Sequence, residues 1–492
     1  MAVPLRKRMY VNLRMLLRII GWLILMESAF MCFPLITAII YHDHDVLDFA
    51  ISTAITASSG SVLIRIRPRS REMGKREAIL LTVLTWVILS LFGMIPFLLS
   101  GAHNSVTDAF FESMNGFTTT GGSALASVNG LSHSVLLWRS IQQWIGGMGI
   151  ILFTIAVAPM LNNQGGMFLF NAEVTGITHD KLRPRISSTA KGLWIVYICL
   201  TAALVALLSL SKMSFFEAVC NGLSTMSTGG FSTSDINIQA WDSLYVKTVI
   251  LIFMILGGIN FSLMFNAFTG RFTPLLKNNA LHWYLGGIFI AYILLSANIL
   301  INGKFNDISD ITIDPLFQAA SVFSSTGITE PGFHDWGALS IIILVVMMFV
   351  GGSAGSTSGG AKVDRVIILV KFLKNEFYKM MHPNTVTSVS VNGKGISYVT
   401  VQKVLAFLCL YIMVIFMGGI LLVITGMSLR DSFFLCLSSI SNTWLSTNVM
   451  DPSGAFPYIP DAAKWILSLV MLVGRLEIYT VLLIFTPIFW KK

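Results

Sequence analysis

Charged residues are scarce in this 492-residue sequence: Asp, Glu, Lys and Arg make up 12% of it, against about a quarter of an average soluble domain. Apolar residues make up 54% of the chain, and the mean hydropathy is +0.75. This composition excludes an ordinary soluble globular protein. The sequence therefore predicts a protein that crosses a membrane several times.

Signatures of catalysis and of structural metal sites are missing as well. The five cysteines lie in apolar segments, and none belongs to a CxxC or Cys/His pair with ligand spacing. The stretch YHDHD contains His42 and His44, but a closed metal site needs three or four ligands, so we favour a solvated turn. The letters GGSAG at 351–355 fit the nucleophile pattern G-x-S-x-G, but they interrupt an apolar run and no catalytic dyad or metal motif accompanies them. We therefore expect neither an enzyme nor a bound cofactor.

Long apolar runs, by contrast, fill most of the chain. The first follows a basic N-terminus without an evident cleavage site, so we interpret it as a retained helix and not a signal peptide. About 20 helical residues cross the ~30 Å hydrocarbon layer of a bilayer. The runs that satisfy this length lie near 16–40, 46–64, 78–100, 135–161, 190–211, 244–268, 281–301, 338–373, 400–426 and 463–488. Ten crossings put both termini on the same side.

Positive charge is concentrated between these runs. The net charge is +9, and most of the 33 lysines and arginines fall in six clusters. The clusters are Arg6–Arg18, Arg65–Arg76, Lys181–Lys191, Arg271–Lys277, Lys362–Lys403 and Lys491–Lys492. Because basic loops stay in the cytoplasm, this spacing predicts cytoplasmic termini and contact with anionic membrane lipid. It does not call for a nucleic-acid partner.

Four shorter pieces repeat between the apolar runs. They read TDAFFESMNGFTTTGGS from Thr107, SFFEAVCNGLSTMSTGGFST from Ser214, IDPLFQAASVFSSTGIT from Ile313 and LRDSFFLCLSSISNTWLSTN from Leu429. Each piece opens with an acid that we expect to cap a short helix. The acids are Asp108, Glu217, Asp314 and Asp431, and counting 13 residues from them reaches Gly121, Gly230, Gly327 and Trp444. The pattern predicts four units, each made of a helix, a half-crossing, an extended loop and a second helix.

Four such re-entrant units can surround a single axis. Non-helical backbone at membrane depth is tolerated only inside protein or beside a water-filled cavity. An extended Thr-Gly stretch can turn carbonyl oxygens toward the axis, and glycine adopts the backbone angles that aim consecutive carbonyls one way. Rings of carbonyls replace the hydration shell of a K⁺-sized cation. The repeat therefore predicts a cation-conducting pore.

Three further motifs accompany the repeats: WIGGMGI at 144–150, GGSAGSTSGGAKV at 351–363 and GRLEIYTVLLIFTP at 474–487. With them, nearly the whole chain resembles the Trk/Ktr/HKT superfamily of potassium uptake proteins, most closely its bacterial TrkH branch. The resemblance implies an all-α polytopic membrane protein with two N-terminal helices and four pseudo-fourfold helix–pore-loop–helix repeats around one ion pore. It also implies K⁺ uptake across the bacterial inner membrane by a homodimer that works with a cytosolic nucleotide-binding ring of the TrkA type.

The filter candidates lie where the four short helices end. They are Thr118, Thr119, Thr120, Gly121, Ser227, Thr228, Gly229, Gly230, Ser325, Thr326, Gly327, Asn442 and Thr443, with K⁺ as the transported ion. In the second unit, Gly229 and Gly230 are both possible as the filter glycine.

The fourth unit departs from the family pattern, because SNTWLSTNVM has no glycine where the family has one. Either a side chain of Asn442, Thr443 or Ser446 contributes to an asymmetric ring, or the 13-residue offset slips there. Selectivity for K⁺ over Na⁺ depends on the number and arrangement of the coordinating oxygens. The departure therefore bears on selectivity.

The glycine-rich stretch after residue 350 is the gate candidate. The preceding apolar run has 13 residues, about 20 Å of helix, so it must break inside the membrane. The stretch lacks the Lys-Ser/Thr pair of a phosphate-binding loop. We expect its glycines to keep it mobile and its hydroxyls to keep it solvated. The gate residues are Gly351, Gly352, Ser353, Ala354, Gly355, Ser356, Thr357, Ser358, Gly359, Gly360 and Arg475.

Three charges inside apolar runs need an explanation, because such charges are costly. The resemblance suggests that Arg475 meets the glycine-rich stretch under the filter; the alternative is a structural pair with a carboxylate such as Glu477. For Arg139 we expect snorkelling to the outer surface and no role. Glu27 is expected to be paired within the helix bundle.

The expected domains are 1–70 for the N-terminal helix pair, followed by pore repeats at 71–188, 189–280, 281–399 and 400–492, the third containing the gating loop 351–362. Two other classes were weighed. An intramembrane hydrolase would need a catalytic dyad or metal motif, and a secondary transporter built from two large halves would lack four short pore units. A less selective K⁺/Na⁺ transporter, coupled to H⁺ or Na⁺, stays open as an alternative.

Overall fold

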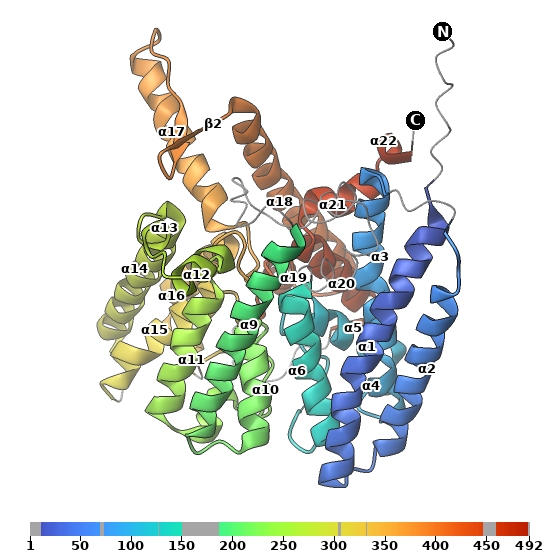
Figure 1. Ribbon diagram of the computed structural model, residues 1–492. Coiled ribbons are helices and arrows are strands. Elements are labelled where there is room, and N and C mark those ends of the chain that lie inside the picture. The colour runs from blue at the N-terminus through green and yellow to red at the C-terminus, as the bar shows by residue number, and fades with distance from the viewer. Residues whose placement is uncertain are drawn as a thin grey trace, which may run out of the picture.

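The computed structural model describes residues 11–68, 73–125, 127–149, 186–303, 307–330, 332–445 and 459–490. Within these ranges the chain is helical apart from one β-hairpin and the connecting segments. The strands β1 (Val389–Val391) and β2 (Lys394–Ile396) pair antiparallel, with Ser390 opposite Gly395. The sequence did not predict this hairpin, which follows α17 on the side of the molecule where both termini lie (Figure 1).

The helices follow the predicted order. The N-terminal pair is α1 (Leu13–Tyr41) and α2 (Val46–Ile64). The first unit contains α3 (Lys75–Gly93), α4 (Ile95–Leu99), α5 (Val106–Phe117) and α6 (His133–Gly147). The second contains α9 (Ile186–Ser209), α10 (Phe215–Met226), η2 (Asn237–Trp241), α11 (Leu244–Gly257), α12 (Phe261–Phe268) and α13 (Thr273–Leu276).

The third and fourth units repeat this arrangement. The third contains α14 (Asn279–Asn302), α15 (Ser309–Phe323), η3 (Phe333–Trp336), α16 (Ala338–Val350) and α17 (Val363–Met381). The fourth contains α18 (Tyr398–Ile424), α19 (Leu429–Ile440), α20 (Asp461–Arg475), α21 (Ile478–Ile484) and α22 (Pro487–Trp490). The short helices α5, α10, α15 and α19 are called pore helices below.

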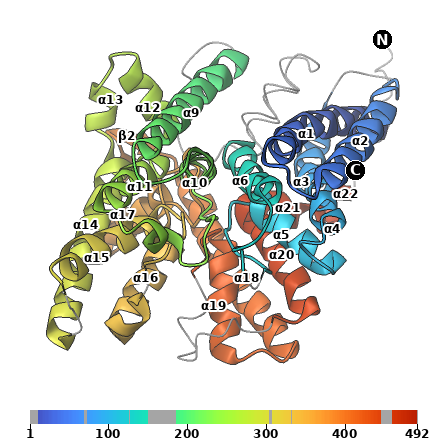
Figure 2. The same cartoon turned by 90° about the horizontal axis from the view of Figure 1, so that it is seen from below.

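The four units form a closed ring. The second long helix of each unit packs against the pore helix of the next: α6 on α10, α11 on α15, α16 on α19, and α20 back on α5. Figure 2 shows the units in successive sectors, with α1 and α2 outside them beside the first unit. The fold class predicted from the repeats is confirmed. The ring gives the ends of the pore helices a common centre.

The N-terminal pair is held by close backbone contact. A Cβ added at Gly21 of α1 would lie 2.8 Å from the Leu63 Cβ and 3.0 Å from the Gly60 carbonyl oxygen of α2. Small residues at such crossings let membrane helices approach closely, which favours their packing. This contact anchors α2 to α1, which in turn packs on α3 and α6.

The pore helices begin with serine caps and not with the predicted acids. Ser105, Ser214 and Ser428 each accept a hydrogen bond from an amide of the first turn, and the acid of each unit follows three residues later. The third unit differs more. Its helix α15 begins at Ser309, so Asp314 lies in the second turn and Pro315 inside the helix. An acid in the first turn can still bind the amide of the cap residue, as Glu217 Oε2 does with the Ser214 amide at 2.8 Å, which completes a capping box in the second unit.

The predicted ten crossings are not all single helices. Six helices of the described residues are long and apolar enough to span, and two bent pairs raise the number to eight. The pair α11 and α12 bends by 105°, and the pair α20 and α21 by 119°. Hydropathy could not reveal these breaks, because both halves of each pair are apolar. The broken helix predicted in the third unit is present, since α16 ends at Val350 and α17 begins at Val363.

Candidate functional site: four strands and an intramembrane loop

All four pore helices end in the same way. The second residue after each helix is left-handed, and the amide of the third donates to the carbonyl five residues back, as in a Schellman motif. The left-handed residues are Thr119, Thr228, Ser325 and Asn442, with φ of 55°, 54°, 58° and 48°. The bonds run from Thr120 to Asn115, Gly229 to Ser224, Thr326 to Ser321 and Thr443 to Ser438, at 2.8–3.1 Å. Non-glycine residues pay about 1–2 kcal/mol for this conformation, so each unit carries strain at the same point.

The segments 118–121, 227–230, 324–327 and 441–444 are called the filter strands below. In the first three, the last residue is a glycine with positive φ: 85° at Gly121, 79° at Gly230 and 75° at Gly327. A Cβ on these glycines would lie 2.2 Å from the Gly229 oxygen, 2.1 Å from the Thr326 oxygen and 2.7 Å from the Trp444 oxygen, respectively. Conformation and the adjacent strand both require glycine there. In the second unit, this position belongs to Gly230.

The fourth strand closes the ring differently. Its last residue, Trp444, does not have a positive φ, and its amide donates to the Thr120 oxygen at 2.8 Å. The indole lies on Gly122, where a Cβ would come within 2.5 Å of the Trp444 Cε3. The side-chain nitrogen Nδ2 of Asn442 donates to Thr120 Oγ1 at 3.0 Å and to the Met471 oxygen at 3.1 Å. The 13-residue offset therefore holds and the ring is asymmetric. Ser446 lies outside the described residues.

Hydroxyl groups brace three of the four strands at their third residue. Thr120 Oγ1 lies 2.8 Å from Thr118 Oγ1, Thr326 Oγ1 lies 2.7 Å from Ser324 Oγ, and Thr443 Oγ1 donates to the Ser441 oxygen at 3.2 Å. The second strand has Gly229 at this position and so lacks a hydroxyl. There, Gln143 of α6 donates from Nε2 to the Gly229 oxygen at 2.8 Å.

The glycine-rich segment 351–362 packs against the ends of three pore helices. The Gly359 amide donates to Ser325 Oγ at 2.6 Å, and a Cβ on Gly359 would lie 2.0 Å from the Ser441 oxygen. Thr357 Oγ1 lies 3.5 Å from the oxygen of Met226, the last residue of α10, and donates to the Gly257 oxygen at 3.0 Å. The expectation that its hydroxyls are solvated was wrong. Ser353, Thr357 and Ser358 are buried, because the segment fills the space that the α11–α12 bend leaves open.

The bend between α11 and α12 is joined to this segment. Asn260 caps α12 through the Ser262 amide at 2.7 Å, and its Nδ2 donates to the Ala354 oxygen at 2.6 Å. The Phe261 amide donates to the Gly355 oxygen at 3.0 Å. The breaks in the second and third units are therefore one structure, in which each satisfies the free backbone groups of the other.

Arg475, the last residue of α20, connects three units. Its Nη1 donates to the Thr357 oxygen at 2.8 Å, and its Nη2 to the Gly146 and Gly147 oxygens at 2.7 and 3.0 Å. Thus one side chain of the fourth unit joins the glycine-rich segment to the end of α6. Glu477, the alternative partner, forms an ion pair with Arg365. The role of Arg475 as a gate residue stays a prediction.

The expectation for Arg139 was wrong. Its side chain does not reach the outer surface but is 2% exposed, and Nε donates to Glu112 Oε1 at 2.8 Å. Its guanidinium carbon also lies 4.1 Å from the centre of the Phe231 ring. Glu112 accepts hydrogen bonds from Ser123 Oγ and the Ala124 amide, each at 2.9 Å. The pair therefore holds the segment after Gly121. The sequence contained both residues but no signal that they face each other.

Glu27 does not meet the partner that we expected. The residue is 2% exposed, and neither carboxylate oxygen has a hydrogen-bond partner among the described residues. The bundle around it is apolar, because α1 packs on α2, α3 and α6 through apolar side chains. The expectation of a partner rested on the cost of burying a charge.

Two lysines form ion pairs with two of the four repeat acids. Lys247 lies 2.7 Å from both Asp314 and Glu330, and Lys464 forms an ion pair with Asp108. Each lysine is the fourth residue of its helix, α11 or α20. Burial raises the pKa of Glu330 above its ordinary value, although the contact with Lys247 acts in the opposite direction. The units thus pair alternately, the second with the third and the fourth with the first.

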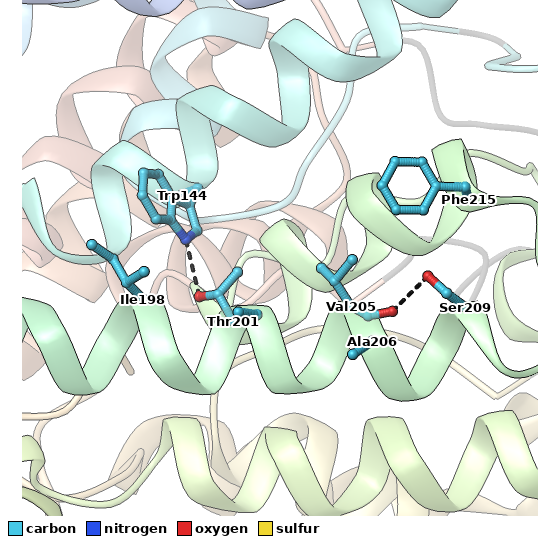
Figure 3. A pocket seen from close by; sticks show the side chains of 8 residues that line it. Trp144, Ile198, Thr201, Val205, Ala206, Ser209 and Phe215 are labelled. Carbon is cyan, nitrogen blue, oxygen red and sulfur yellow. Dashed lines mark hydrogen bonds between the residues drawn. The ribbon is translucent and has the colours of Figure 1, made fainter.

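A groove of about 460 Å³ on the outside of the bundle is separate from this site. It lies between α6, α9 and α10 and is lined by Trp144, Ile198, Thr201, Ala202, Val205, Ala206, Ser209 and Phe215 (Figure 3). Its polar groups are already bonded: Trp144 Nε1 to Thr201 Oγ1 at 3.1 Å, and Ser209 Oγ to the Val205 oxygen at 2.8 Å. An apolar groove with an exposed Phe215 suits contact with lipid and not the passage of ions.

Comparison with known proteins agrees with this geometry. Residues 46–492 match the family model of the TrkH cation transport protein. The Trk system potassium uptake protein TrkH of Salmonella typhimurium is 34% identical over 490 residues, which cover 98% of this chain and all of that protein. TrkH of Escherichia coli K12 is 33% identical over 485 residues, again covering 98% of this chain and all of the relative.

A solved structure agrees as well. The crystal structure of the potassium transporter TrkH from Vibrio parahaemolyticus superposes with a TM-score of 0.88 at 31% identity, and the match covers 98% of this chain and all of the other. Family model, sequence relatives and structure all extend over the four units. The chain therefore belongs to the TrkH family of cation transport proteins, which are transporters and not enzymes.

Proposed function

We propose that this chain carries K⁺ into the cell across the inner membrane through the ring of filter strands. The observation that supports it most is the closure of that ring: four strained helix ends in one register, with each strand in contact with the next. Its relatives are named potassium uptake proteins. A dehydrated K⁺ would pass between the carbonyl oxygens of the strands, which replace its water shell.

The site residues of this proposal are those expected from the sequence. Backbone oxygens of Thr118–Gly121, Ser227–Gly230, Ser325–Gly327 and Asn442–Thr443 would hold the ion. The strain at Thr119, Thr228, Ser325 and Asn442 supports this role, because strained backbone persists where function requires a fixed geometry. In this proposal Gly230 is the filter glycine of the second unit, which its positive φ supports.

The segment 351–360 is proposed as the gate. It packs against three pore helix ends and is linked to α6 by Arg475, so it must move before an ion can leave the ring on that side. Arg475→Gln would weaken the bonds to the Thr357, Gly146 and Gly147 oxygens. We expect ⁸⁶Rb⁺ leak into proteoliposomes to rise roughly tenfold, which corresponds to about 1.4 kcal/mol. Arg65→Gln, at an exposed arginine, is the control.

Loop deletion tests the gate independently of Arg475. A variant without residues 353–358 should conduct without regulation. If its flux equals that of the unmodified protein, the gate lies elsewhere.

Control from the cytosol would act on the basic segments. We propose a homodimer bound to a nucleotide-binding ring of the TrkA type, with both termini on the cytoplasmic side and membrane lipid around the bundle. The segments that would receive the ring are Arg271–Lys277 and the hairpin after α17, both on the terminus side of the molecule (Figure 1). The domain boundaries at 71, 189, 281 and 400 belong to the same proposal.

One experiment tests the transport function itself. The chain is expressed in a bacterium that lacks its own K⁺ uptake systems, and growth is followed at low K⁺ with and without excess Na⁺. If the protein restores growth and excess Na⁺ does not reduce that growth, selective K⁺ uptake is supported. If the protein is present in the membrane but growth is not restored, the proposal is contradicted.

A less selective K⁺/Na⁺ transporter, coupled to H⁺ or Na⁺, is the second candidate. Trp444 favours it, because the fourth strand lacks the glycine and the backbone conformation of the other three. Rescue that excess Na⁺ abolishes would favour this candidate over the first.

A further inference from the structure

Three successive residues of α6 face three different neighbours. Gln142 Nε2 donates to the Gly93 oxygen at 3.0 Å and to Ser113 Oγ at 3.1 Å. Trp144 faces Thr201 of α9, as Figure 3 shows. Between them, Gln143 faces the second filter strand, because successive helical residues are about 100° apart. Both glutamines are fully buried, so each amide must find its partners inside the protein.

The Gln143 amide makes three hydrogen bonds to the second unit. Nε2 donates to the Gly229 oxygen at 2.8 Å, and Oε1 accepts from Ser224 Oγ at 2.7 Å and from the Phe231 amide at 3.1 Å. A backbone amide only donates and a carbonyl oxygen only accepts, which fixes the orientation of the side-chain amide. The contact is close: a Cβ on Gly229 would lie 2.3 Å from Gln143 Cδ. Gly229 thus has no room for a side chain.

Gln143 takes the place of the hydroxyl group that the second strand lacks. At the third position of the strand, the other units have Thr120, Thr326 and Thr443, whose hydroxyls bond within their own strands. Gly229 has no hydroxyl, and the Gln143 amide from the preceding unit binds its carbonyl instead. The same carbonyl lies against Gly121 of the first strand, where an added Cβ would be 2.2 Å away. Fixing the Gly229 oxygen therefore fixes the spacing of the first two strands.

The fourth strand has its third-position carbonyl bound within its own unit, by Ser438 Oγ at 2.7 Å, so the brace by an amide of the preceding unit is a feature of the second strand. Gly146, Gly257 and Gly474 lie near the ends of α6, α11 and α20, and each faces the last residue of a pore helix through the oxygen of Phe117, Met226 or Ile440. Three residues earlier, the helices carry Gln143, Met254 and Met471. Both methionines are fully buried and offer no N–H donor. The first unit is thus the one among these three with an amide at this level.

We propose that Gln143 is a positioning residue for K⁺ selection: its amide sets the orientation of the Gly229 carbonyl and so one side of the ion-binding ring. The proposal rests on the proposed function, in which the ring selects K⁺ by the arrangement of its oxygens. Without the amide, the Gly229 peptide can rotate, since neither a hydroxyl nor a side chain restrains it. Rotation changes the distance of that oxygen from the ion and weakens discrimination against Na⁺.

The test compares Gln143→Met with Gln142→Met. Gln143→Met gives α6 the side chain that α11 and α20 carry at this level, and Gln142→Met removes an equally buried amide whose partners lie outside the filter strands. In proteoliposomes, we expect Gln143→Met to lower the K⁺ over Na⁺ flux ratio about tenfold, or about 1.4 kcal/mol. Gln142→Met should keep the K⁺ over Na⁺ flux ratio of the unmodified protein. Its thermal stability should fall by about as much as that of Gln143→Met.

The outcomes separate the two proposals. Absence of K⁺ flux in the unmodified protein would contradict the proposed function. A selective unmodified protein and an equally selective Gln143→Met would contradict the role of Gln143. An equal loss of selectivity in both variants would also contradict it, because the effect would then come from general loosening of α6.

A second variant keeps the test open if Gln143→Met does not reach the membrane. Ser224→Ala removes the hydroxyl that donates to Gln143 Oε1 and leaves the glutamine in place. We expect about a threefold fall in the K⁺ over Na⁺ flux ratio, and, where Gln143→Met does reach the membrane, no further fall when the two changes are combined. Additive losses, or no loss in Ser224→Ala, would contradict an action through the amide.

Discussion

The second and fourth filter strands depart from the other two in opposite ways. The first and third strands end in Thr-Gly; the second ends in Gly229–Gly230, and the fourth in Thr443–Trp444. The second has therefore kept the glycine with positive φ and lost the hydroxyl, whereas the fourth has kept the hydroxyl and lost the glycine. In each case a neighbouring unit supplies the compensation: Gln143 binds Gly229, and Gly122 leaves room for the Trp444 indole.

The comparison separates two requirements that the Thr-Gly pair usually meets together. The third position of a strand needs a brace behind its peptide, and this brace can come from another helix. The fourth position needs either a left-handed glycine against the next strand or, as in Trp444, a backbone that donates to that strand. The first requirement concerns orientation of a carbonyl, and the second concerns the distance between strands.

Gly230→Ser would break the comparison most severely, because it gives the second strand a non-glycine end like that of the fourth. The new Cβ would lie 2.1 Å from the Thr326 oxygen, and the φ of 79° is unfavourable for serine. We expect K⁺ uptake to fall at least about 100-fold, or about 2.7 kcal/mol, in proteoliposome flux assays. At the corresponding position of the first strand, Gly121→Ser should raise Na⁺ permeation relative to K⁺.

A matched control for Gly230→Ser is available in Gly130→Ser. Gly130 has a similar φ of 94°, but nothing lies within 4 Å of its missing Cβ. We expect normal flux from this variant. If both variants transported equally well, backbone contact between the strands would not matter, and the two strand ends would be interchangeable.

Gly229→Ala sharpens the comparison at the third position. Its φ is not positive, so alanine fits the backbone, but the Cβ would lie 2.3 Å from Gln143 Cδ. Overpacking of this kind costs about 1–3 kcal/mol. We expect a lower melting temperature for the purified Gly229→Ala protein.

The double variant Gly229→Ala/Gln143→Ala should be as stable as Gln143→Ala alone, because the clash is gone, but it should not recover the selectivity for K⁺. Recovery of the selectivity would show that Gln143 only fills space. A double variant clearly less stable than Gln143→Ala would mean that the clash lies elsewhere than at Gln143.

Gly122→Ala applies the same test to the fourth strand. Its Cβ would meet the Trp444 indole at 2.5 Å, so we expect a loss of about 1–3 kcal/mol of stability. In a Trp444→Gly background the same alanine should cost less, because the indole is gone and the contact with Asn115 Oδ1 at 2.7 Å remains. Melting temperatures of the four proteins in this cycle give the coupling, and additive effects would mean that Gly122 and Trp444 do not constrain each other.

Much of this architecture could be predicted from spacing alone. The acid at a constant distance from Gly121, Gly230 and Gly327 set the register correctly, since each pore helix ends at the same distance from its acid, although α15 begins earlier than the others. The same count could not decide between Gly229 and Gly230 with any certainty, because the sign of φ is a property of the folded backbone. It also could not show that the neighbour of Gly229 is Gln143, which is 86 residues away.

The errors have a common physical origin in contacts between distant segments. Hydropathy placed Arg139 near a helix end, but its environment is set by Glu112 on another helix. Likewise, α11–α12 and α20–α21 are apolar on both sides of their bends, and what stabilises the first bend is a contact with Ala354 and Gly355. GGIN at 257–260 and GRLE at 474–477 were the available signals, since glycine and asparagine commonly end or cap helices.

The smallest expected effect concerns the left-handed residues themselves. Replacing Thr228 or Asn442 by glycine relieves about 1 kcal/mol of backbone strain in either strand. Thr228 Oγ1 donates to the oxygen of its own neighbour, Ser227, so little is lost in the second strand. Asn442 would lose two bonds, to Thr120 and Met471, each worth about 1 kcal/mol.

We therefore expect Thr228→Gly to leave the melting temperature nearly unchanged and Asn442→Gly to lower it by the equivalent of about 1 kcal/mol. Equal shifts in melting temperature for the two variants would mean that the backbone alone holds the fourth strand in place. The first and third strands are held by their terminal glycines in the same way. A larger fall for Asn442→Gly, accompanied by weaker discrimination against Na⁺, would mean that the fourth strand depends on side chains from the first and fourth units. In that case the asparagine does for the fourth strand what Gln143 does for the second.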